Sequence, residues 1–393
     1  MTFRGKLALA FTLGATLLLS SCGQAVQLAN QLVSQNRTRP QVQAPGADDL
    51  LRIARAYAQG RHSSAATPVK LASADASADG SVQEENYKDQ IAADFAREDY
   101  DALEKAAHAD LSPTARFAGG TWRVWGYYEG LATPPAGGKA TDDDWNTQIN
   151  ALKAWVAARP DSSAARIALA EAYDNFGAKA RGAGYADTVS DEGWQLYNER
   201  LALSANTLVG AAKLKEKSPY WFTVMYDVAA AEGWDKSQFK ELLDASISFE
   251  PSYYHSYRLY AQYIQPKWFG QEGDAQAFAE QISAQIGGEE GDFVYFELAT
   301  TLACGCDKDD DQNAIQRLSW PKIKSGYAAV EHLYGRSSLK TNRFAYLAFL
   351  ENDRTTAQAA FNATNYHWDQ RAWPSYNTFL QAEAWANRQF GGQ

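Results

Sequence analysis

Residues 218–269 constrain the fold more than any other stretch, because apolar side chains recur in them every three or four positions. That spacing places the side chains on one face of an α-helix. Pro219 suits the first turn of a helix, and Gly233 ends that helix. Pro251 ends the next one, since the residue before a proline avoids helical geometry. The stretch therefore predicts three consecutive helices.

None of these helices can bury its apolar stripe alone, so neighbouring helices must pack against one another, as in a helical repeat array. Similar periodicity predicts further helices at 87–109, 113–131, 145–155, 162–182, 191–214, 274–286, 292–303, 321–334, 338–351, 353–363 and 374–389. No run of alternating apolar and polar residues is long enough to predict a β-strand. The predicted fold class is all-α, an irregular array of helical hairpins.

Two proline junctions resemble those of tetratricopeptide repeats. Residues 157–161 precede a Leu-Ala-x-x-Tyr pattern that begins at Leu169, and the interval from Pro219 to Pro251 is close to the tetratricopeptide period. Several segments are also similar to an uncharacterised bacterial family with a tetratricopeptide-like domain of unknown function: GYADTVSDEGWQLYNERL, EGW, PKWFGQEGD and NRFAYLAFLENDRTTAQAAF. The resemblance covers residues 87–373 and implies an irregular α-solenoid without implying an activity.

The N-terminus has the pattern of a targeting signal. Two basic residues precede an apolar run at 7–19, which is too short to span a bilayer but has the length of a signal-peptide core. The run ends in Leu-Ser-Ser-Cys22, which resembles the lipobox of bacterial lipoproteins. The resemblance implies cleavage before Cys22, lipidation of Cys22 and a stable anchor in the cell envelope, in the outer membrane if the cell is Gram-negative. A secretory signal without lipidation is the alternative.

Composition divides the chain into a signal peptide (1–21), a flexible tether (22–83) and a helical-repeat domain (84–393). The tether is rich in small and polar residues, so it cannot bury enough surface to stay ordered. One short amphipathic helix is expected inside it, over residues 48–60. A flexible tether of about 60 residues would hold the domain about 40 Å from the membrane.

The charge of the chain excludes one class of partner. The 393 residues have a formal net charge of −10, and removal of the signal peptide makes it about −12. An acidic protein repels nucleic-acid phosphates and anionic lipid headgroups, and no run of Lys and Arg offsets that repulsion. We therefore expect no nucleic-acid partner and expect membrane contact only through Cys22.

The other two cysteines, Cys304 and Cys306, are separated by a single residue. In an oxidising compartment they could form a disulfide, which the short spacing would strain. The pair is interpreted either as redox-active thiols or as a local staple at a helix end. The staple is favoured because no thioredoxin-like pattern surrounds the pair.

Three aspartates at positions 307, 309 and 311 have the alternate spacing that opens a calcium loop. However, Gln312 and Leu318 stand where such a loop needs a glycine and a bidentate glutamate. Two Ser-x-x-Lys tetrads, at 237–240 and 319–322, lack the companion elements of serine nucleophiles and are interpreted as chance, and motifs typical of dinucleotide sites and zinc hydrolases do not occur. We therefore expect no metal, no cofactor and no enzymatic activity.

The chain has 12 Trp, 21 Tyr and 17 Phe, and most of them fall in the apolar stripes. Four lie off the stripes or in loops: Trp234, Tyr254, Tyr263 and Trp268. Exposed aromatic rings stack on sugars and anchor protein partners, so these four are the predicted binding residues.

Together these features predict a lipid-anchored envelope protein whose helical repeats serve as a protein-interaction scaffold. A glycan-binding accessory lipoprotein is the first alternative, and it requires a solvent-facing row of aromatic rings. The second is a helical-toroid polysaccharide lyase, because residues 365–368 (Asn-Tyr-His-Trp) are similar to the Asn, His and Tyr clusters of those enzymes. A lyase requires a deep pocket with clustered His, Glu or Tyr.

Overall fold

The computed structural model describes residues 43–60, 78–182, 188–303 and 308–388. Within these ranges the chain forms seventeen α-helices and no β-strand, which confirms the all-α fold class. No helix in the described ranges is both long enough and apolar enough to cross a membrane.

The helices follow one another with short connections. The first eight elements are α2 (Ala47–Ala58), α3 (Gly80–Ala96), α4 (Tyr100–Ala109), α5 (Arg123–Glu129), the 3-10 helix η3 (Gly137–Lys139), α6 (Asp142–Ala158), α7 (Ser163–Arg181) and α8 (Asp191–Ala212). The next five are α9 (Tyr220–Ala231), α10 (Lys236–Phe249), α11 (His255–Tyr263), α12 (Asp274–Ile286) and α13 (Gly288–Leu302). The last five are α14 (Lys308–Ile315), α15 (Trp320–Tyr334), α16 (Ser338–Leu350), α17 (Arg354–Ala363) and α18 (Tyr376–Asn387).

The three helices predicted within residues 218–269 form as α9, α10 and α11. The hydroxyl of Ser218 accepts a hydrogen bond from the backbone of Tyr220 at the start of α9, at 3.3 Å. The α10 helix begins at Lys236, because Asp235 caps it by accepting hydrogen bonds from backbone N–H groups of the first turn. The proline and glycine signals thus placed the helix ends to within a few residues.

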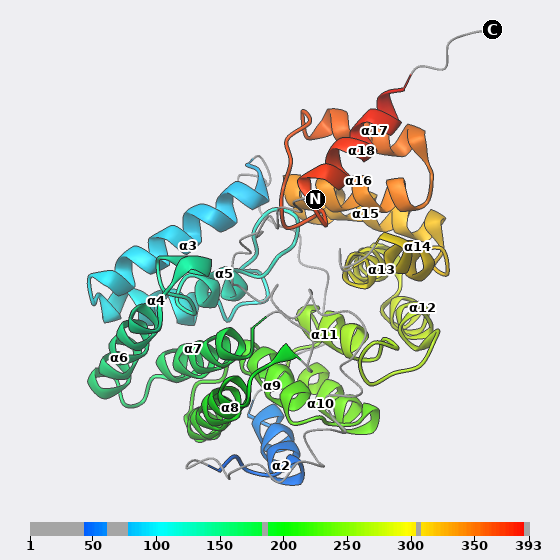
Figure 1. Cartoon of the computed structure of the whole chain (residues 1–393). Helices are drawn as coiled ribbons and strands as arrows, with labels where there is room; N and C mark the ends of the chain where they lie inside the picture. Colours follow the sequence, from blue (N-terminus) through cyan, green and yellow to red (C-terminus); the bar gives the residue numbers. More distant parts are fainter. Residues whose placement is uncertain (1–42, 61–77, 183–187, 304–307, 389–393) are drawn as a thin grey trace, which may run out of the picture.

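The succession of helices turns back on itself, so that α3 meets α16 (Figure 1). We call residues 79–81 and 337–338 the closing contact. Asp79 accepts hydrogen bonds from the backbone of Ser81, at 2.9 Å, and of Ser338, at 3.0 Å, although Asp79 and Ser338 are 259 positions apart in the sequence. One carboxylate therefore serves the N-termini of two helices that come from opposite ends of the array.

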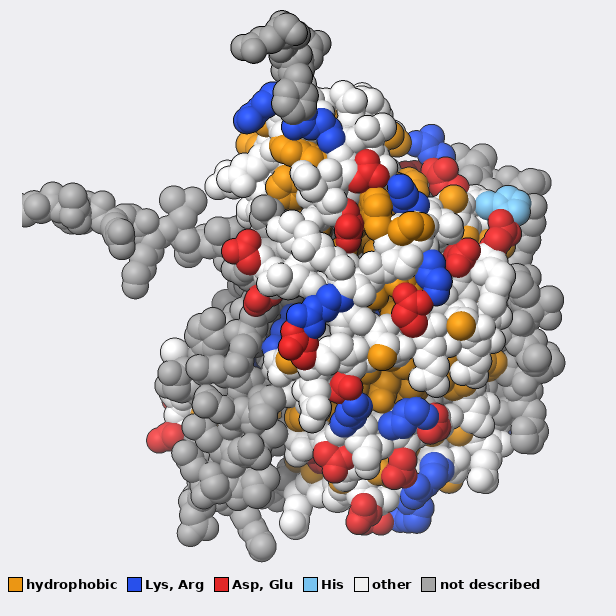
Figure 2. Space-filling model, turned by 90° about the vertical axis from the view of Figure 1, so that its right-hand side faces the viewer, with side chains coloured by type: hydrophobic (Ala, Val, Ile, Leu, Met, Phe, Trp, Pro, Cys, Tyr) orange, Lys and Arg blue, Asp and Glu red, His pale blue; other side chains and the backbone are white. Residues whose placement is uncertain are grey.

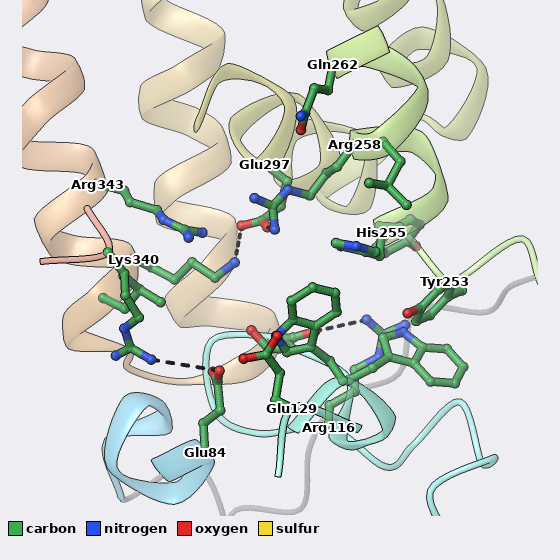
Figure 3. A pocket seen from close by; sticks show the side chains of 18 of the residues that line it. Glu84, Arg116, Glu129, Tyr253, His255, Arg258, Gln262, Glu297, Lys340 and Arg343 are labelled. Carbon is green, nitrogen blue, oxygen red and sulfur yellow. Dashed lines mark hydrogen bonds and ion pairs between the residues drawn. The ribbon is translucent and has the colours of Figure 1, made fainter. Parts of the chain in front are cut away.

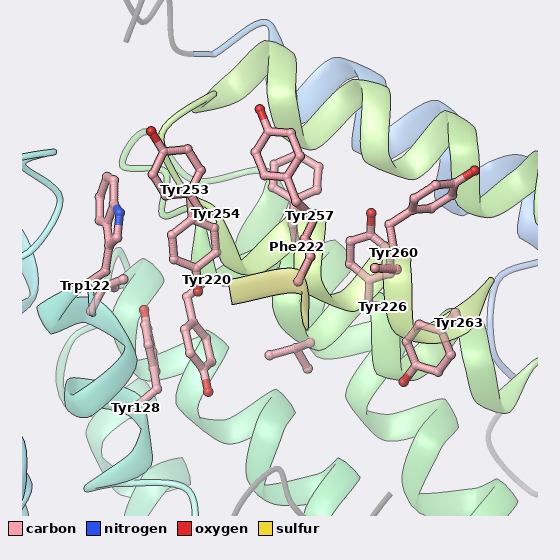
Figure 4. Packing of buried hydrophobic residues seen from close by; sticks show 14 of the residues in the cluster. Trp122, Tyr128, Tyr220, Phe222, Tyr226, Tyr253, Tyr254, Tyr257, Tyr260 and Tyr263 are labelled. Carbon is pink, nitrogen blue, oxygen red and sulfur yellow. The ribbon is translucent and has the colours of Figure 1, made fainter. Parts of the chain in front are cut away.

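The core along α9 and α11 consists largely of aromatic rings (Figure 4). The rings of Tyr128 and Tyr220 stack with their centroids 4.2 Å apart, and those of Phe239 and Tyr263 stack at 4.9 Å. Each buried ring removes a large apolar area from water, and stacking adds to this stabilisation. The core thereby holds α9 and α11 rigidly in place.

The α2 helix belongs to the globular body, although the sequence placed it in the flexible tether. Leu50 and Tyr57 are buried against α8 and α10. The ring of Tyr57 stacks on Trp221 at 4.4 Å, and its hydroxyl donates to the carbonyl of Ser218 at 3.0 Å. The predicted domain start at residue 84 was therefore wrong, because an apolar helix face in a polar segment finds its partner far along the chain.

The predicted helix at 113–131 was also wrong over its first half, since α5 begins only at Arg123. Gly119 and Gly120 have φ angles of +81° and +87°, which are unfavourable for residues with a Cβ. A Cβ added at Gly120 would lie 2.8 Å from the ring of Tyr334. The glycine pair therefore makes a tight turn that brings Arg116 close to Trp122, to which it is joined by an isolated β-bridge.

Candidate functional site

A cavity of about 410 Å³ lies between the two ends of the helical array. Its volume is within the range of small-molecule sites in proteins. Its walls come from α3, α5, α9, α11, α13 and α16, from the turn at 116–122 and from residues 370–371. The lining extends from Glu84 to Arg371, so the cavity lies between helices that the closing contact joins.

One face of α11 forms a long wall of the cavity. Its residues recur at the helical spacing: His255, Arg258, Leu259, Gln262 and Tyr263. The α13 and α16 helices contribute Glu297, Lys340 and Arg343. Arg258 on α11, and Lys340 and Arg343 on α16, are therefore held on helices whose other faces lie in the apolar core.

We call Arg258, Lys340, Arg343 and Glu297 the cationic cluster (Figure 3). Lys340 Nζ lies 2.5 Å from Glu297 Oε1, and Arg258 Nη1 lies 3.6 Å from Glu297 Oε2. Arg258 Nε also donates to the hydroxyl of Thr301 at 2.8 Å. Arg343 makes no hydrogen bond or ion pair with any residue in the described part of the chain. Two of the three cations thus pair with the one carboxylate of the cluster, and Arg343 interacts with Glu297 and with the nearby Asp369 only through longer-range electrostatics.

The electrostatics of the cationic cluster follow from burial and from this imbalance. Glu297 and Lys340 are only 4% and 3% exposed. Burial, together with repulsion from Arg343 and Arg258, lowers the pKa of Lys340 to about 8, although Glu297 opposes the shift. Burial and repulsion from Arg258 also lower the pKa of Arg343 to about 10. Burial favours the neutral form of Glu297, but the three cations outweigh it and lower its pKa, so the carboxylate is ionised.

Another arginine of the cavity lining, Arg116, is buried and has a structural role. Its guanidinium donates to the carbonyls of Pro113 at 3.1 Å, Gly120 at 3.1 Å and Ser252 at 3.0 Å. It also lies 4.9 Å from the ring centroid of Trp122, within cation–π distance. These contacts fix the glycine turn against the segment that leads into α11.

Carboxyl groups line another part of the cavity. Burial raises the pKa of Glu129, and the nearby Lys88, 3.8 Å away, opposes the shift. Burial also raises the pKa of Asp227 to about 7, although the Tyr263 hydroxyl donates to its carboxylate at 3.2 Å. Both carboxyl groups are therefore protonated more readily than they would be in water. In the protonated form, each can donate a hydrogen bond.

Ion pairs complete the wall where α3 faces the segment before α18. Arg371 lies 2.7 Å from Glu85 and 2.8 Å from Asp369, and Lys88 lies 3.1 Å from Glu84. The Arg371–Glu85 pair joins parts of the chain that are 286 positions apart, whereas the other two pairs are local.

The four predicted binding aromatics are buried, not exposed: Trp234 at 2%, Tyr254 at 5%, Tyr263 at 0% and Trp268 at 8% exposure. Trp234 and Trp268 do not line the cavity, whereas Tyr254 and Tyr263 do. The hydroxyl of Tyr254 donates to Glu290 at 2.5 Å. The prediction that these rings face solvent was wrong, because helices in the array are covered on more than one face.

The other predicted site residues do not join the cavity. Cys22, Cys304 and Cys306 lie outside the described residues, so their lipidation and pairing stay predictions. Asp311, one of the aspartates with calcium-loop spacing, is buried and accepts a hydrogen bond from Tyr346 at 2.7 Å. In the described ranges, no group of three or more His, Cys, Asp or Glu residues could hold a metal ion.

The tetrad at 365–368 that suggested a lyase is also separate from the cavity lining. The ring of Tyr366 stacks on Phe361, with centroids 6.0 Å apart, and its hydroxyl donates to Asn362 at 2.8 Å. These contacts explain the tetrad as part of the loop that follows α17.

Sequence reasoning missed the cationic cluster. The available signal was a basic pair, Lys340 and Arg343, inside a helix that is otherwise largely apolar (SLKTNRFAYLAFL). A charged residue on a buried helix face indicates either a buried ion pair or a ligand site. Comparison of the chain with protein-family models, curated proteins and solved structures gives no match. The tetratricopeptide resemblance therefore stays a prediction.

Proposed function

We propose that the protein binds a small anionic molecule, carrying a carboxylate or phosphate group, in the central cavity. The observation that supports this proposal most directly is Arg343, a partly buried guanidinium that lines the cavity and has no hydrogen-bond or ion-pair partner among the described residues. Guanidinium groups bind carboxylate and phosphate oxygens with two parallel hydrogen bonds.

The charge balance of the cationic cluster supports the same conclusion. Burying a charge without a counter-charge costs free energy, and the cluster has two more positive than negative charges. A bound anion would supply the missing negative charge inside a low-dielectric site, where Coulomb attraction is strong. The net charge of the whole protein is negative, so the excess of positive charge would be a local property of the cavity.

The remaining cavity wall suits the body of an organic ligand. Trp125 offers an aromatic surface, and Gln262, Glu129 and Asp227 offer polar groups that fix orientation. The visible molecular face in Figure 2, by contrast, has basic and acidic side chains interspersed, with hydrophobic ones in small separate areas. Such a mixed surface favours the cavity as the main recognition site.

The predicted lipid anchor and repeat fold are compatible with this function. We infer that the helices form an irregular tetratricopeptide-like array closed into a ring, because successive helices pack in pairs, as α6 does on α7 and α12 on α13. In the cell envelope, an anchored protein of this kind would capture its ligand near the membrane.

A protein partner is the second candidate, favoured by one observation. The large hydrophobic side chains that are most exposed in the described residues are Val82, Trp368, Tyr376 and Leu380. The rings of Trp368 and Tyr376 lie 5.2 Å apart but are inclined by 61°, so they do not form one flat platform for a sugar. Crosslinking in cells, with the Trp368→Ser/Tyr376→Ser variant for comparison, would test whether this surface captures a specific protein.

The anion proposal is tested by isothermal titration calorimetry with inorganic phosphate, glucose 6-phosphate, malate, succinate and D-glucuronate. We expect saturable binding of at least one probe to the wild-type protein. Arg343→Gln should weaken that binding by about 30-fold or more, since a charged hydrogen bond is worth about 2 kcal/mol or more.

Arg52→Gln is the matched control, because Arg52 is a solvent-exposed arginine on α2 with a single surface ion pair to Asp49. It removes the same charge without touching the cavity and should leave the affinity unchanged. The proposal is contradicted if no probe binds, or if both variants change the affinity equally.

A further inference from the structure

His255 is the cavity residue whose chemistry anion binding alone does not use. It is the first residue of α11 and lines the cavity one turn before Arg258. Its ring lies 4.2 Å from that of Trp125, which fixes the orientation of the imidazole. Figure 3 shows the imidazole directed toward the cationic cluster.

The two nitrogens of His255 differ in accessibility. Nε2 is enclosed by protein and has no hydrogen-bond partner among the described residues. Nδ1 also makes no hydrogen bond within the described part of the chain, but it is not enclosed in this way, so it is the nitrogen that can meet a ligand. A neutral imidazole with its proton on Nε2 would present the Nδ1 lone pair to the cavity.

The surroundings keep this imidazole neutral. Burial lowers the pKa of His255 well below its usual value, and Arg258, Lys340 and Arg343 lower it further. No carboxylate within hydrogen-bond distance opposes them among the described residues, since the carboxylate of Glu297 is engaged by Lys340 and Arg258. A neutral base therefore stands next to a site that binds an anion through several positive charges.

We propose that the cavity is a catalytic site in which His255 removes a proton from the carbon atom next to a carboxylate held by Arg258, Lys340 and Arg343. This inference depends on the proposed anion binding and adds a reaction class to it. It differs from the sequence-based expectation that the protein has no enzymatic activity.

The step balances without a cofactor. The C–H bond of the substrate breaks, its proton moves to Nδ1 of His255, and its electron pair moves into the carboxylate to form an enediolate. The enediolate carries one more negative charge than the bound carboxylate, and the cationic cluster stabilises that additional charge. Return of a proton from the imidazolium to the carbon completes the exchange.

The reaction is tested in D₂O by proton NMR, with malate and D-glucuronate as probes at millimolar concentration. We expect the signal of the proton next to the carboxylate to disappear with at least one probe in the presence of wild-type protein. His255→Asn should slow the loss by about 100-fold or more, in line with the usual contribution of a general base. Calorimetry on the same variant should give an affinity within about threefold of wild type, because asparagine leaves the cationic cluster intact.

His332→Asn is the matched control, since His332 lies on the surface and pairs only with Glu289. It should exchange as fast as wild type. Binding of a probe without exchange by the wild-type protein would overturn the catalytic inference and leave the anion proposal standing. If neither malate nor D-glucuronate binds, the cavity does not accept carboxylates and the catalytic inference fails. Equal exchange by wild type and His255→Asn would exclude His255 as the base.

Discussion

At the scale of single residues, the charged side chains that line the cavity are expected to lower the stability of the free protein. Lys340 and Glu297 are almost completely buried and form a close ion pair, while Arg343 remains without a partner in the described structure. Buried charges that do not contribute to stability are commonly retained for function. A side chain of this kind is expected to stabilise a complex and to destabilise the free protein.

The first prediction follows from these opposite effects of Arg343 on the complex and on the free protein. Arg343→Met keeps most of the side-chain volume and removes a partly buried positive charge, so the free variant should be more stable than wild type by about 1 kcal/mol. Urea unfolding of both proteins, without added anions, measures the difference. A loss of more than about 2 kcal/mol would instead mean that Arg343 has a structural role.

The second prediction concerns pH. Burial and the two neighbouring arginines lower the pKa of Lys340 to about 8, and a bound anion must raise it again. Above that pH the free lysine is neutral, so anion affinity should fall by up to about tenfold per pH unit. Calorimetry between pH 7.5 and 9.5 measures the slope; the pKa of Asp227, about 7, lies below this window, and that of Arg343, about 10, lies above it.

Lys340→Arg is the control for this slope, because arginine keeps its charge across the window. Its affinity should be nearly independent of pH. If the variant shows the same slope as wild type, another group, and not Lys340, controls the binding.

The residues that form the site were the part of the structure that the sequence predicted least well. Aromatic residues such as Tyr254 and Trp268 interrupt the apolar stripes, and nothing local indicates that a distant helix covers them. The same applies to Lys340 and Arg258, which meet only because α11 and α16 face each other across the cavity. Burial, and contacts between segments that are distant in the sequence, depend on tertiary packing. The periodicity of a single helix does not encode that packing.

At the scale of elements, local signals were sufficient where proline, glycine or a capping residue marks a helix end. The α9 to α11 region formed as predicted, with small shifts such as the cap at Asp235. The segment around Gly119 and Gly120 did not, because a turn with positive φ angles was interpreted as a weak point of a helix. That turn is an essential part of the cavity, since it positions Arg116.

The third prediction tests the closing contact. Asp79 caps α3 and also accepts hydrogen bonds from Ser338 at the start of α16, so Asp79→Ala should cost about 2–3 kcal/mol and weaken anion binding. Asp99→Ala is the matched control, because Asp99 caps only α4, through Ala102. It should cost about 1 kcal/mol and leave binding unchanged. Equal effects of the two variants on stability and on affinity would show that the closing contact does not maintain the cavity.

At the scale of the whole molecule, the helices of the described chain pack around a central cavity. The cavity lies between elements that are nearly 300 positions apart, which explains why the sequence alone predicted an interaction scaffold and not this cavity. The all-α class follows from periodicity, whereas the meeting of α3 with α16 involves contacts between distant residues, such as that of Asp79 with Ser338. The lipid anchor stays a prediction from the first 22 residues.

The fourth prediction tests that anchor. Cys22→Ser should abolish incorporation of labelled palmitate and release the protein from the membrane fraction, because cleavage and acylation require the cysteine. Cys304→Ser should leave both unchanged. Membrane association of Cys22→Ser at the wild-type level would show that another feature holds the protein there.

The most direct test of the central claim is a crystal structure of the protein soaked with the anion that binds most tightly in calorimetry. We predict electron density for that anion inside the cavity, with its charged group within hydrogen-bond distance of Arg343 and Lys340. Density for the anion only on the outer surface, with the cavity free of it at saturating concentration, would contradict the account.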